Sequence, residues 1–203
     1  MTDQSLLFEG LDPTARHEGD FYATPRFQLE MLLSRLSFRP ARVIEPAAGN
    51  LAIVTPLRKS GIEVWANDLV KRDEPLDSVM DAKHSAFWAT AMNQGFSDAV
   101  VITNLPFNEA APILFWAIRF CRVVCTILRV TFDEPTEDRN EWLAANPLAG
   151  RVVMPRYSYR KNGSGDSTTT AWHIWSSIPN VVKPHDVVTL AERDRLIAKY
   201  GDR

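Results

Sequence analysis

The sequence has little cysteine, no long apolar run and no excess of positive charge. Its two cysteines among 203 residues lack the C-x-x-C spacing of a redox motif and the Cys/His clusters of a zinc site. No run reaches the ~18 consecutive apolar residues that a membrane-spanning helix needs. Residues 1–12 include acidic and no basic side chains, which excludes the pattern of a secretory signal. We therefore expect a cytoplasmic protein with reduced, buried cysteines and no membrane contact.

Histidine is also scarce, and the charge balance limits the partners. The four histidines do not cluster in the sequence, so we expect no metal site. A formal net charge of -2 argues against a protein coated with positive charge, such as a nonspecific nucleic-acid packager. Nucleic-acid binding would need a local basic patch, which residues 151–161 provide because they include no acidic side chain. The candidate contacts are Arg156, Tyr157, Tyr159, Arg160 and Lys161. A solvated basic loop is the alternative.

Two kinds of apolar pattern alternate along the chain and indicate the fold class. Helical periodicity marks some segments, and short β-branched runs that end at polar residues mark the strands between them. The expected helices are 26–36, 51–60, 83–93 and 109–120, and the expected strands are 41–44, 64–66, 99–103, 123–130, 152–154 and 171–175. This order implies right-handed crossovers and a parallel sheet with helices on both faces. We expect residues 1–20 to form an arm and residues 21–203 a single domain.

The turn after the first expected strand contains a single glycine, which limits the ligands it can take. It reads Glu45-Pro46-Ala47-Ala48-Gly49-Asn50, whereas a dinucleotide site needs G-x-G-x-x-G and a P-loop needs G-x-x-x-x-G-K-[ST]. A carboxylate at Glu45 repels phosphate and suits a cation. S-adenosylmethionine carries an ammonium and a sulfonium but no phosphate, so electrostatics favours it over NAD or ATP. An ordinary turn with one acidic residue is the alternative.

Acidic side chains further along are candidates for other parts of the same ligand. Asp68 follows the second expected strand, where a carboxylate can accept hydrogen bonds from both ribose hydroxyls. It lies 23 positions after Glu45, about the separation of neighbouring strands linked by one helix. Asp81 with Ala82 is a candidate for the adenine amino group of the ligand. A solvated aspartate is the alternative for each.

Asn104-Leu105-Pro106-Phe107 follows an expected buried strand and carries groups that suit a planar amine. The Asn104 amide and a proline-stiffened backbone carbonyl can both accept hydrogen bonds from one NH2 group. The lone pair of an aryl amine is delocalised into its ring, and two acceptors on its protons favour a more nucleophilic nitrogen. Phe107 would then stack on the base. An ordinary strand ending is the alternative.

These motifs, preceded by Phe21-Tyr22-Ala23-Thr24-Pro25, resemble those of the amino-group DNA methyltransferases, most closely the small phage-type DNA N6-adenine methyltransferases. The similarity extends from about residue 20 to about residue 175. It implies a Rossmann-like class I methyltransferase fold, with a mostly parallel seven-stranded sheet and a reversed last strand. It also implies S-adenosyl-L-methionine as cofactor, DNA as partner, and a bacterial or phage-encoded protein in the host cytoplasm.

The resemblance, with the reasoning above, assigns roles to individual residues. The candidate cofactor contacts are Tyr22, Thr24, Glu45, Pro46, Ala47, Gly49, Asn50, Asp68, Asp81 and Ala82, and the candidate catalytic residues are Asn104, Leu105, Pro106 and Phe107. The family's tetrapeptide usually reads [DNS]-P-P-[YFW], so Leu105 departs from it. That position acts through its backbone carbonyl, which leucine also has, so we expect the chemistry to survive although the ring that fixes φ is lost.

Three alternatives to a DNA adenine methyltransferase stay open from the sequence. Release-factor glutamine methyltransferases use N-P-P-Y on an amide nitrogen, RNA adenine presents the same amine as DNA adenine, and a noncatalytic nucleic-acid-binding module can keep the fold. The basic segment favours a nucleic-acid substrate over a protein amide. Leu105 is the feature that favours a noncatalytic module. Asn104 fits adenine better than cytosine in the family. There is little room for a target-recognition domain, so we expect short or relaxed sequence specificity.

Overall fold

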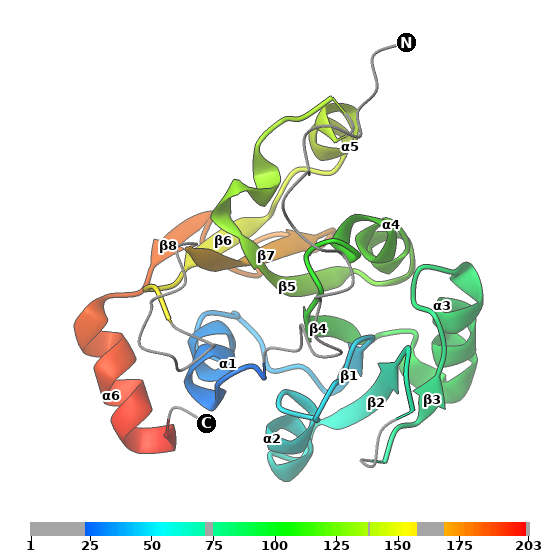
Figure 1. Ribbon diagram of the computed structural model, residues 1–203, viewed down its shortest axis with the longest axis horizontal. Helices are drawn as coiled ribbons and strands as arrows, with labels where there is room; N and C mark the ends of the chain where they lie inside the picture. Colours follow the sequence, from blue (N-terminus) through cyan, green and yellow to red (C-terminus); the bar gives the residue numbers. More distant parts are fainter. Residues whose placement is uncertain (1–22, 72–74, 138, 158–168, 202–203) are drawn as a thin grey trace, which may run out of the picture.

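The computed structural model describes residues 23–71, 75–137, 139–157 and 169–201. They form one sheet with helices on both of its faces (Figure 1). The helical elements are α1 (Arg26–Leu33), α2 (Val54–Lys59), α3 (Ser85–Ala91), the π-helical η2 (Met92–Phe96), α4 (Ala110–Phe120), the 3-10 turn η3 (Val130–Asp133), α5 (Asn140–Ala145) and α6 (Leu190–Tyr200). The strands are β1 (Arg42–Glu45), β2 (Glu63–Asp68), β3 (Ser78–Val79), β4 (Val100–Asn104), β5 (Val123–Arg129), β6 (Gly150–Val153), β7 (Thr170–Ser176) and β8 (His185–Val187).

The sheet has the order β3-β2-β1-β4-β5-β7-β6-β8. The strands from β3 to β5 are parallel to one another, and β7 runs antiparallel to both β5 and β6. The predicted class of mostly parallel α/β fold with one reversed strand is therefore confirmed. β7 is the last strand that the sequence predicted. The sheet has eight described strands instead of seven because the short strand β8 pairs with β6 at the far edge.

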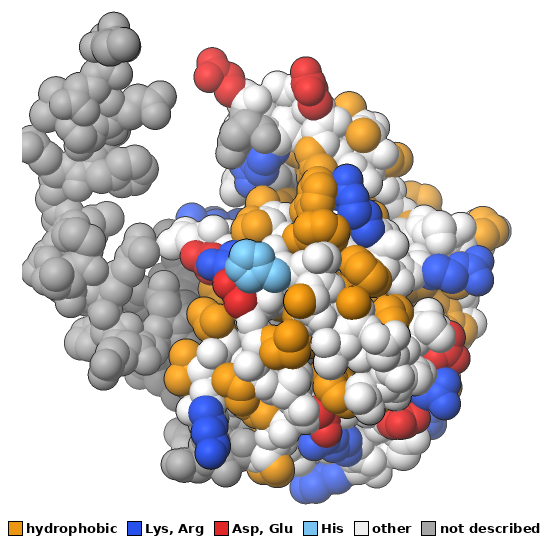
Figure 2. Space-filling model, turned by 90° about the vertical axis from the view of Figure 1, so that its right-hand side faces the viewer, with side chains coloured by type: hydrophobic (Ala, Val, Ile, Leu, Met, Phe, Trp, Pro, Cys, Tyr) orange, Lys and Arg blue, Asp and Glu red, His pale blue; other side chains and the backbone are white. Residues whose placement is uncertain are grey.

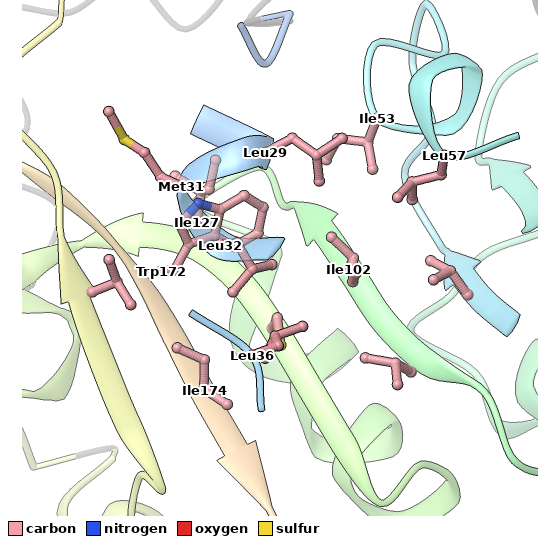
Figure 3. Packing of buried hydrophobic residues seen from close by; sticks show 14 of the residues in the cluster. Leu29, Met31, Leu32, Leu36, Ile53, Leu57, Ile102, Ile127, Trp172 and Ile174 are labelled. Carbon is pink, nitrogen blue, oxygen red and sulfur yellow. The ribbon is translucent and has the colours of Figure 1, made fainter. Parts of the chain in front are cut away.

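Both faces of the central strands are buried, which is why their sequences are apolar throughout rather than alternating. In β4, Val100 and Ile102 belong to the core on the α1 and α2 side, whereas Val101 belongs to the core on the α3 and α4 side. Figure 3 shows the first core, where Leu32 of α1 lies over the strands that carry Ile102 and Trp172. The two cores hold the sheet rigidly, and the carboxyl ends of its strands are therefore fixed in position.

Several elements differ from the sequence prediction for local reasons. α2 begins three residues later than expected, because Leu51 adopts a left-handed conformation with φ of 62°. The helix expected to end at Asn93 instead continues into η2, where Gly95 has a φ of 92°. α6 was not predicted, although Thr189 caps it by accepting a hydrogen bond from the Glu192 N–H. The T-x-x-E pattern at its start is a capping signal that the sequence carried.

Other expectations concern what the fold lacks. Both cysteines are buried, and neither forms a disulfide. Burial raises the pKa of the Cys121 thiol to about 12. In the described ranges, no group of three or more His, Cys, Asp or Glu side chains is placed to hold a metal ion. No helix in the described part of the chain has the length and apolar character needed to cross a membrane.

Candidate functional site at the carboxyl ends of the strands

The candidate site lies where the strand order changes direction. From β1 the chain moves to β2 and β3 on one side of the sheet and later returns to β4 and β5 on the other. Ligands of open α/β sheets bind outside the carboxyl ends of the strands at such a switch point. Glu45, Asp68 and Asn104 are the last residues of β1, β2 and β4. The structure therefore brings these three predicted residues to one edge of the sheet.

Glu45 lies buried beneath the turn that follows β1. Its Oε1 accepts hydrogen bonds from Thr103 Oγ1 at 2.5 Å and from the Ala47 N–H at 3.1 Å. The pKa of Glu45 is raised to about 8, mainly because burial disfavours the charged form and to a smaller extent because of the Asp68 carboxylate, while the two hydrogen bonds lower it in part. The side chain is therefore mostly protonated at neutral pH, not ionised as the sequence suggested. A ligand cation nearby would favour the ionised form again.

Replacing Glu45 with glutamine is expected to remove a pH dependence of stability. The pKa of Glu45 rises from 4.5 to about 8 on folding, so its contribution is complete below pH 4.5 and is lost as pH rises towards 8. Each pH unit in that window changes the free energy of unfolding by about 1.4 kcal/mol. The loss between pH 6.5 and 8 should therefore be about 2 kcal/mol larger in the wild type than in Glu45→Gln. Urea unfolding of both proteins across this range measures it, and parallel curves would contradict the assignment.

The turn after β1 is held against β2 by Asp68. The Asp68 Oδ2 accepts a hydrogen bond from the Gly49 N–H at 2.8 Å, and its Oδ1 accepts one from the Val70 N–H at 3.1 Å. Gly49 has a φ of 53°, a conformation that glycine adopts without strain. Asp68 is buried, with 7% of its surface exposed. It contacts the turn at Gly49, and Glu45 contacts the same turn at Ala47. The two acidic groups therefore border one site.

The remaining predicted residues of this turn have structural partners. The Pro46 carbonyl accepts a hydrogen bond from Asn67 Nδ2 at 2.9 Å. Ala47 is partly buried and donates its N–H to Glu45. Asn50 is exposed, and its Oδ1 accepts a hydrogen bond from the Ala52 N–H at 3.2 Å. These contacts fix the backbone of the turn, which is the part that a ligand would meet.

Asn67 links three segments at this edge and was not among the predicted site residues. Its Nδ2 donates to the carbonyls of Pro46 and Met80, and its Oδ1 accepts from Ser78 Oγ at 2.8 Å. The side chain is fully buried, so each of these bonds satisfies a group that water does not reach. The only sequence signal for Asn67 was its place beside Asp68 at the end of an apolar strand.

Asp81 and Ala82, the candidates for an adenine amino group, follow β3 at this edge. Asp81 Oδ1 accepts a hydrogen bond from the Lys83 N–H at 2.9 Å. Ala82 is buried, and its carbonyl accepts from Trp88 Nε1 at 2.9 Å. The Ala82 carbonyl is thus engaged with the core, and the partly exposed Asp81 is the better placed of the two to meet a ligand.

Asn104 is oriented by Thr24, which precedes α1. Asn104 Nδ2 donates to Thr24 Oγ1 over 3.1 Å. The amide nitrogen is the donor in this bond, and the oxygen of the same amide is a hydrogen-bond acceptor. Thr24 is buried and was predicted only as a cofactor contact. The structure gives it a further contact with Asn104, 80 residues away in sequence.

The other residues of the tetrapeptide have distinct environments. Leu105 is 2% exposed and packs in the core between the sheet and helices α3 and α4. The leucine side chain is therefore part of the hydrophobic core. Its backbone carbonyl follows directly after the last residue of β4. The Pro106 carbonyl accepts from the Glu109 N–H at 2.9 Å and starts the turn into α4. Phe107 is partly buried.

Arg129 lies over Phe107 and was also missed from the sequence. Its guanidinium carbon is 5.1 Å from the centroid of the Phe107 ring, a cation–π distance. Arg129 ends β5 and is exposed, whereas the six residues before it in the strand are buried. A charged residue that ends an apolar β-branched run was the available signal.

The basic segment is described only in part. Arg156 is exposed, and its Nε donates to Thr169 Oγ1 at 3.3 Å. The Tyr157 ring packs edge-on against Phe27 of α1, with 5.3 Å between ring centroids. The other predicted residues, Tyr22, Tyr159, Arg160 and Lys161, lie outside the described residues.

Two grooves elsewhere on the molecule contain none of the three strand-end residues. One of about 560 Å³ lies at the amino end of β2 and includes Arg58, Glu63 and Asp77. The other, of about 280 Å³, includes Phe115 and Trp142, from α4 and α5. In Figure 2, hydrophobic side chains extend from the upper part of the visible face across its centre to its lower part. Neither groove carries the hydrogen-bonding groups found at the strand ends.

Comparison with known proteins places this geometry in a structural class. No family model matches the sequence, and no curated protein matches it. A candidate class I S-adenosylmethionine-dependent methyltransferase from Listeria monocytogenes has a TM-score of 0.55 at 12% identity, over 97% of this chain and 74% of that one. A candidate RNA methyltransferase from Pyrococcus horikoshii has a TM-score of 0.52 at 16% identity, over 75% of this chain and 81% of that one.

This chain has the Rossmann-like class I methyltransferase fold. A modification subunit of a candidate type I restriction enzyme from Vibrio vulnificus shares it, with a TM-score of 0.57 at 12% identity. The match covers 94% of this chain but 54% of that subunit, so the chain spans about half of its length. In this fold the edge that carries Glu45, Asp68 and Asn104 is the edge of the strand switch point. The fold class predicted from the sequence is thus found independently in solved structures.

Proposed function

We propose that this chain transfers a methyl group from S-adenosyl-L-methionine to the N6 amine of adenine in DNA. The observation that carries the proposal is the position of Asn104 at the end of β4, where its Nδ2 donates to Thr24 and where its amide oxygen would accept from a substrate amine. Asn104 lies at the same edge as Glu45 and Asp68. An amine acceptor and two acidic groups thus meet at the switch point of a methyltransferase fold.

The residues at this edge fit the proposed cofactor. Glu45 keeps Oε2 for a ligand, because both of its described hydrogen bonds end on Oε1. Its ionised form would attract the ammonium or sulfonium of the cofactor. Asp68 offers carboxylate oxygens for ribose hydroxyls, and the turn at Gly49 has no side chain there to block a ligand. The cofactor supplies the electrophilic methyl group, and the chain holds it in place.

The substrate amine is positioned by the tetrapeptide. The Asn104 amide oxygen and the Leu105 carbonyl accept hydrogen bonds from its two N–H groups, which favours lone-pair density on the nitrogen aligned with the methyl group. Substitution of leucine for the family's first proline leaves this carbonyl in place. The chemistry needs no strong base, because positioning and electrostatic stabilisation supply the rate enhancement. Phe107 offers a ring face for the base.

The choice of DNA rests on charge and on the neighbours. Arg156 and the basic residues that follow it in sequence suit a polyanion better than a protein glutamine. The similar solved structures include a modification subunit of a candidate type I restriction enzyme and a candidate RNA methyltransferase. RNA adenine is therefore the second candidate. We also propose that residues 21–203 act as a single catalytic domain, encoded by a bacterium or a phage, in the cytoplasm of the bacterial host.

Incubation with tritiated S-adenosylmethionine tests the proposal. The wild type receives DNA, RNA and protein separately, and the labelled nucleoside is identified after digestion. We expect label in N6-methyladenine from DNA and none with the Asn104→Ala control. Label in RNA adenine, or in protein, would replace the DNA assignment. A protein that binds no cofactor in calorimetry would be a noncatalytic module.

A further inference from the structure

Arg129, the last residue of β5, lies at the same edge of the sheet, next to the tetrapeptide that we propose positions the substrate. Asn104 of β4 pairs with Ile127 of β5, so Arg129 lies two residues further along and on the same face of the sheet as Asn104. Its guanidinium covers one face of the Phe107 ring. A base that stacks on Phe107 would therefore use the other face. Arg129 is thus adjacent to the place where the target base would lie.

Arg156 reaches the same neighbourhood from the segment after β6. Arg129 pairs with Thr170 across β5 and β7, and the Val130 N–H donates to the Thr169 carbonyl at 3.1 Å. Arg156 donates to the hydroxyl of the same Thr169. Both arginines therefore flank the first residues of β7, although they are 27 positions apart in sequence.

These two arginines differ from those that stabilise the fold. Arg35 forms ion pairs with Asp186 and Glu192, and Arg151 forms one with Asp133. Among the described residues, no carboxylate lies within ion-pairing distance of Arg129 or Arg156. Two guanidinium groups without an acidic partner at a ligand-binding edge are suited to an anion with several oxygens, and phosphate is bound by such groups in bidentate fashion.

We infer that Arg129 and Arg156 bind a backbone phosphate of the substrate strand next to the target nucleotide. The inference rests on the proposed function, since it requires a nucleic-acid substrate. The Arg129 guanidinium lies over the Phe107 ring at a cation–π distance, a contact that would reduce the entropy lost when the phosphate binds. The same ring therefore has two tasks, with the base on one face and the cation on the other.

Equilibrium binding of a fluorescent adenine-containing DNA duplex, measured by anisotropy at several salt concentrations with S-adenosylhomocysteine present, tests this inference. Arg129→Ala and Arg156→Ala should each weaken binding about ten-fold. The double variant Arg129→Ala/Arg156→Ala should lower the magnitude of the slope of log K against log salt by about 0.9, the value for one phosphate that is no longer neutralised, and each single variant should lower it by part of that amount. Arg129→Lys keeps the charge and should restore the slope.

Arg122→Ala is the matched control, because Arg122 is exposed at the opposite end of the same strand, next to its first residue. It should leave affinity and slope unchanged. An unchanged slope in Arg129→Ala and Arg156→Ala, with the wild type binding and methylating DNA, would overturn this inference alone. A wild type that neither binds nor methylates nucleic acid would overturn the proposed function with it. Thermal unfolding of each variant shows that the fold is kept.

Discussion

Asn104→Ala is expected to lower the rate of methyl transfer by about 1000-fold, the loss typical of removing one preorganised polar group that acts on the transition state. Cofactor affinity should stay within a few-fold of the wild type, because the proposed role of the Asn104 amide oxygen is to accept from the substrate amine and not from the cofactor. Single-turnover rates with radiolabelled cofactor and calorimetry of cofactor binding give the two quantities separately. An equal loss of methyl-transfer rate and of cofactor affinity would contradict the role given to Asn104.

Two further variants separate the chemistry from the fold. Asn104→Asp keeps an acceptor oxygen and has the residue that the family also uses at this position, so it should retain more activity than alanine. Thr24→Val removes the hydroxyl that accepts the hydrogen bond from Asn104 Nδ2. This variant keeps the amide but not its orientation, so we expect a smaller loss of rate than in Asn104→Ala.

Asp68→Ala is expected to weaken cofactor binding about 100-fold, because hydrogen bonds to a charged group contribute about 1.5–3 kcal/mol each. Part of this loss comes from the turn, since Asp68 also accepts from the Gly49 N–H. Calorimetry with S-adenosylhomocysteine measures the affinity. Asp68→Asn, which keeps one acceptor oxygen and the side-chain shape, should lose less.

A cofactor analogue that lacks a ribose hydroxyl distinguishes the two parts. If Asp68 binds the ribose, the wild type should bind the deoxy analogue more weakly than the parent compound, and Asp68→Ala should bind both equally. A penalty of the same size in both proteins would show that Asp68 acts only through the turn. This comparison is a double-mutant cycle between the side chain and the hydroxyl.

The sequence predicted the sheet well because its strands are buried on both faces. Strands such as β4 and β5 appear as unbroken apolar runs, and the polar residues at their ends mark the edge where ligands bind. Glu45, Asp68 and Asn104 could be found in this way. The elements that escaped prediction are short or peripheral, such as β3 and β8, whose few residues carry no period of their own.

What the sequence could not supply was contact between distant residues. The bond between Thr24 and Asn104, the three-way links of Asn67 and the stacking of Arg129 on Phe107 each join segments that only folding brings together. The protonation state of Glu45 also could not be predicted from the sequence. The sequence identifies an acidic residue, but the pKa of its side chain depends on how deeply folding buries it.

The reversed direction of β7 has a consequence for how such a protein can diversify. Because β6 and β7 are antiparallel neighbours, the chain between Met154 and Thr170 leaves and rejoins the sheet at the same edge, where the Met154 N–H bonds to the Thr170 carbonyl. Insertions or deletions between these two residues would leave the strand register intact. Evolution can therefore change the segment between these two residues without rebuilding the sheet beneath it.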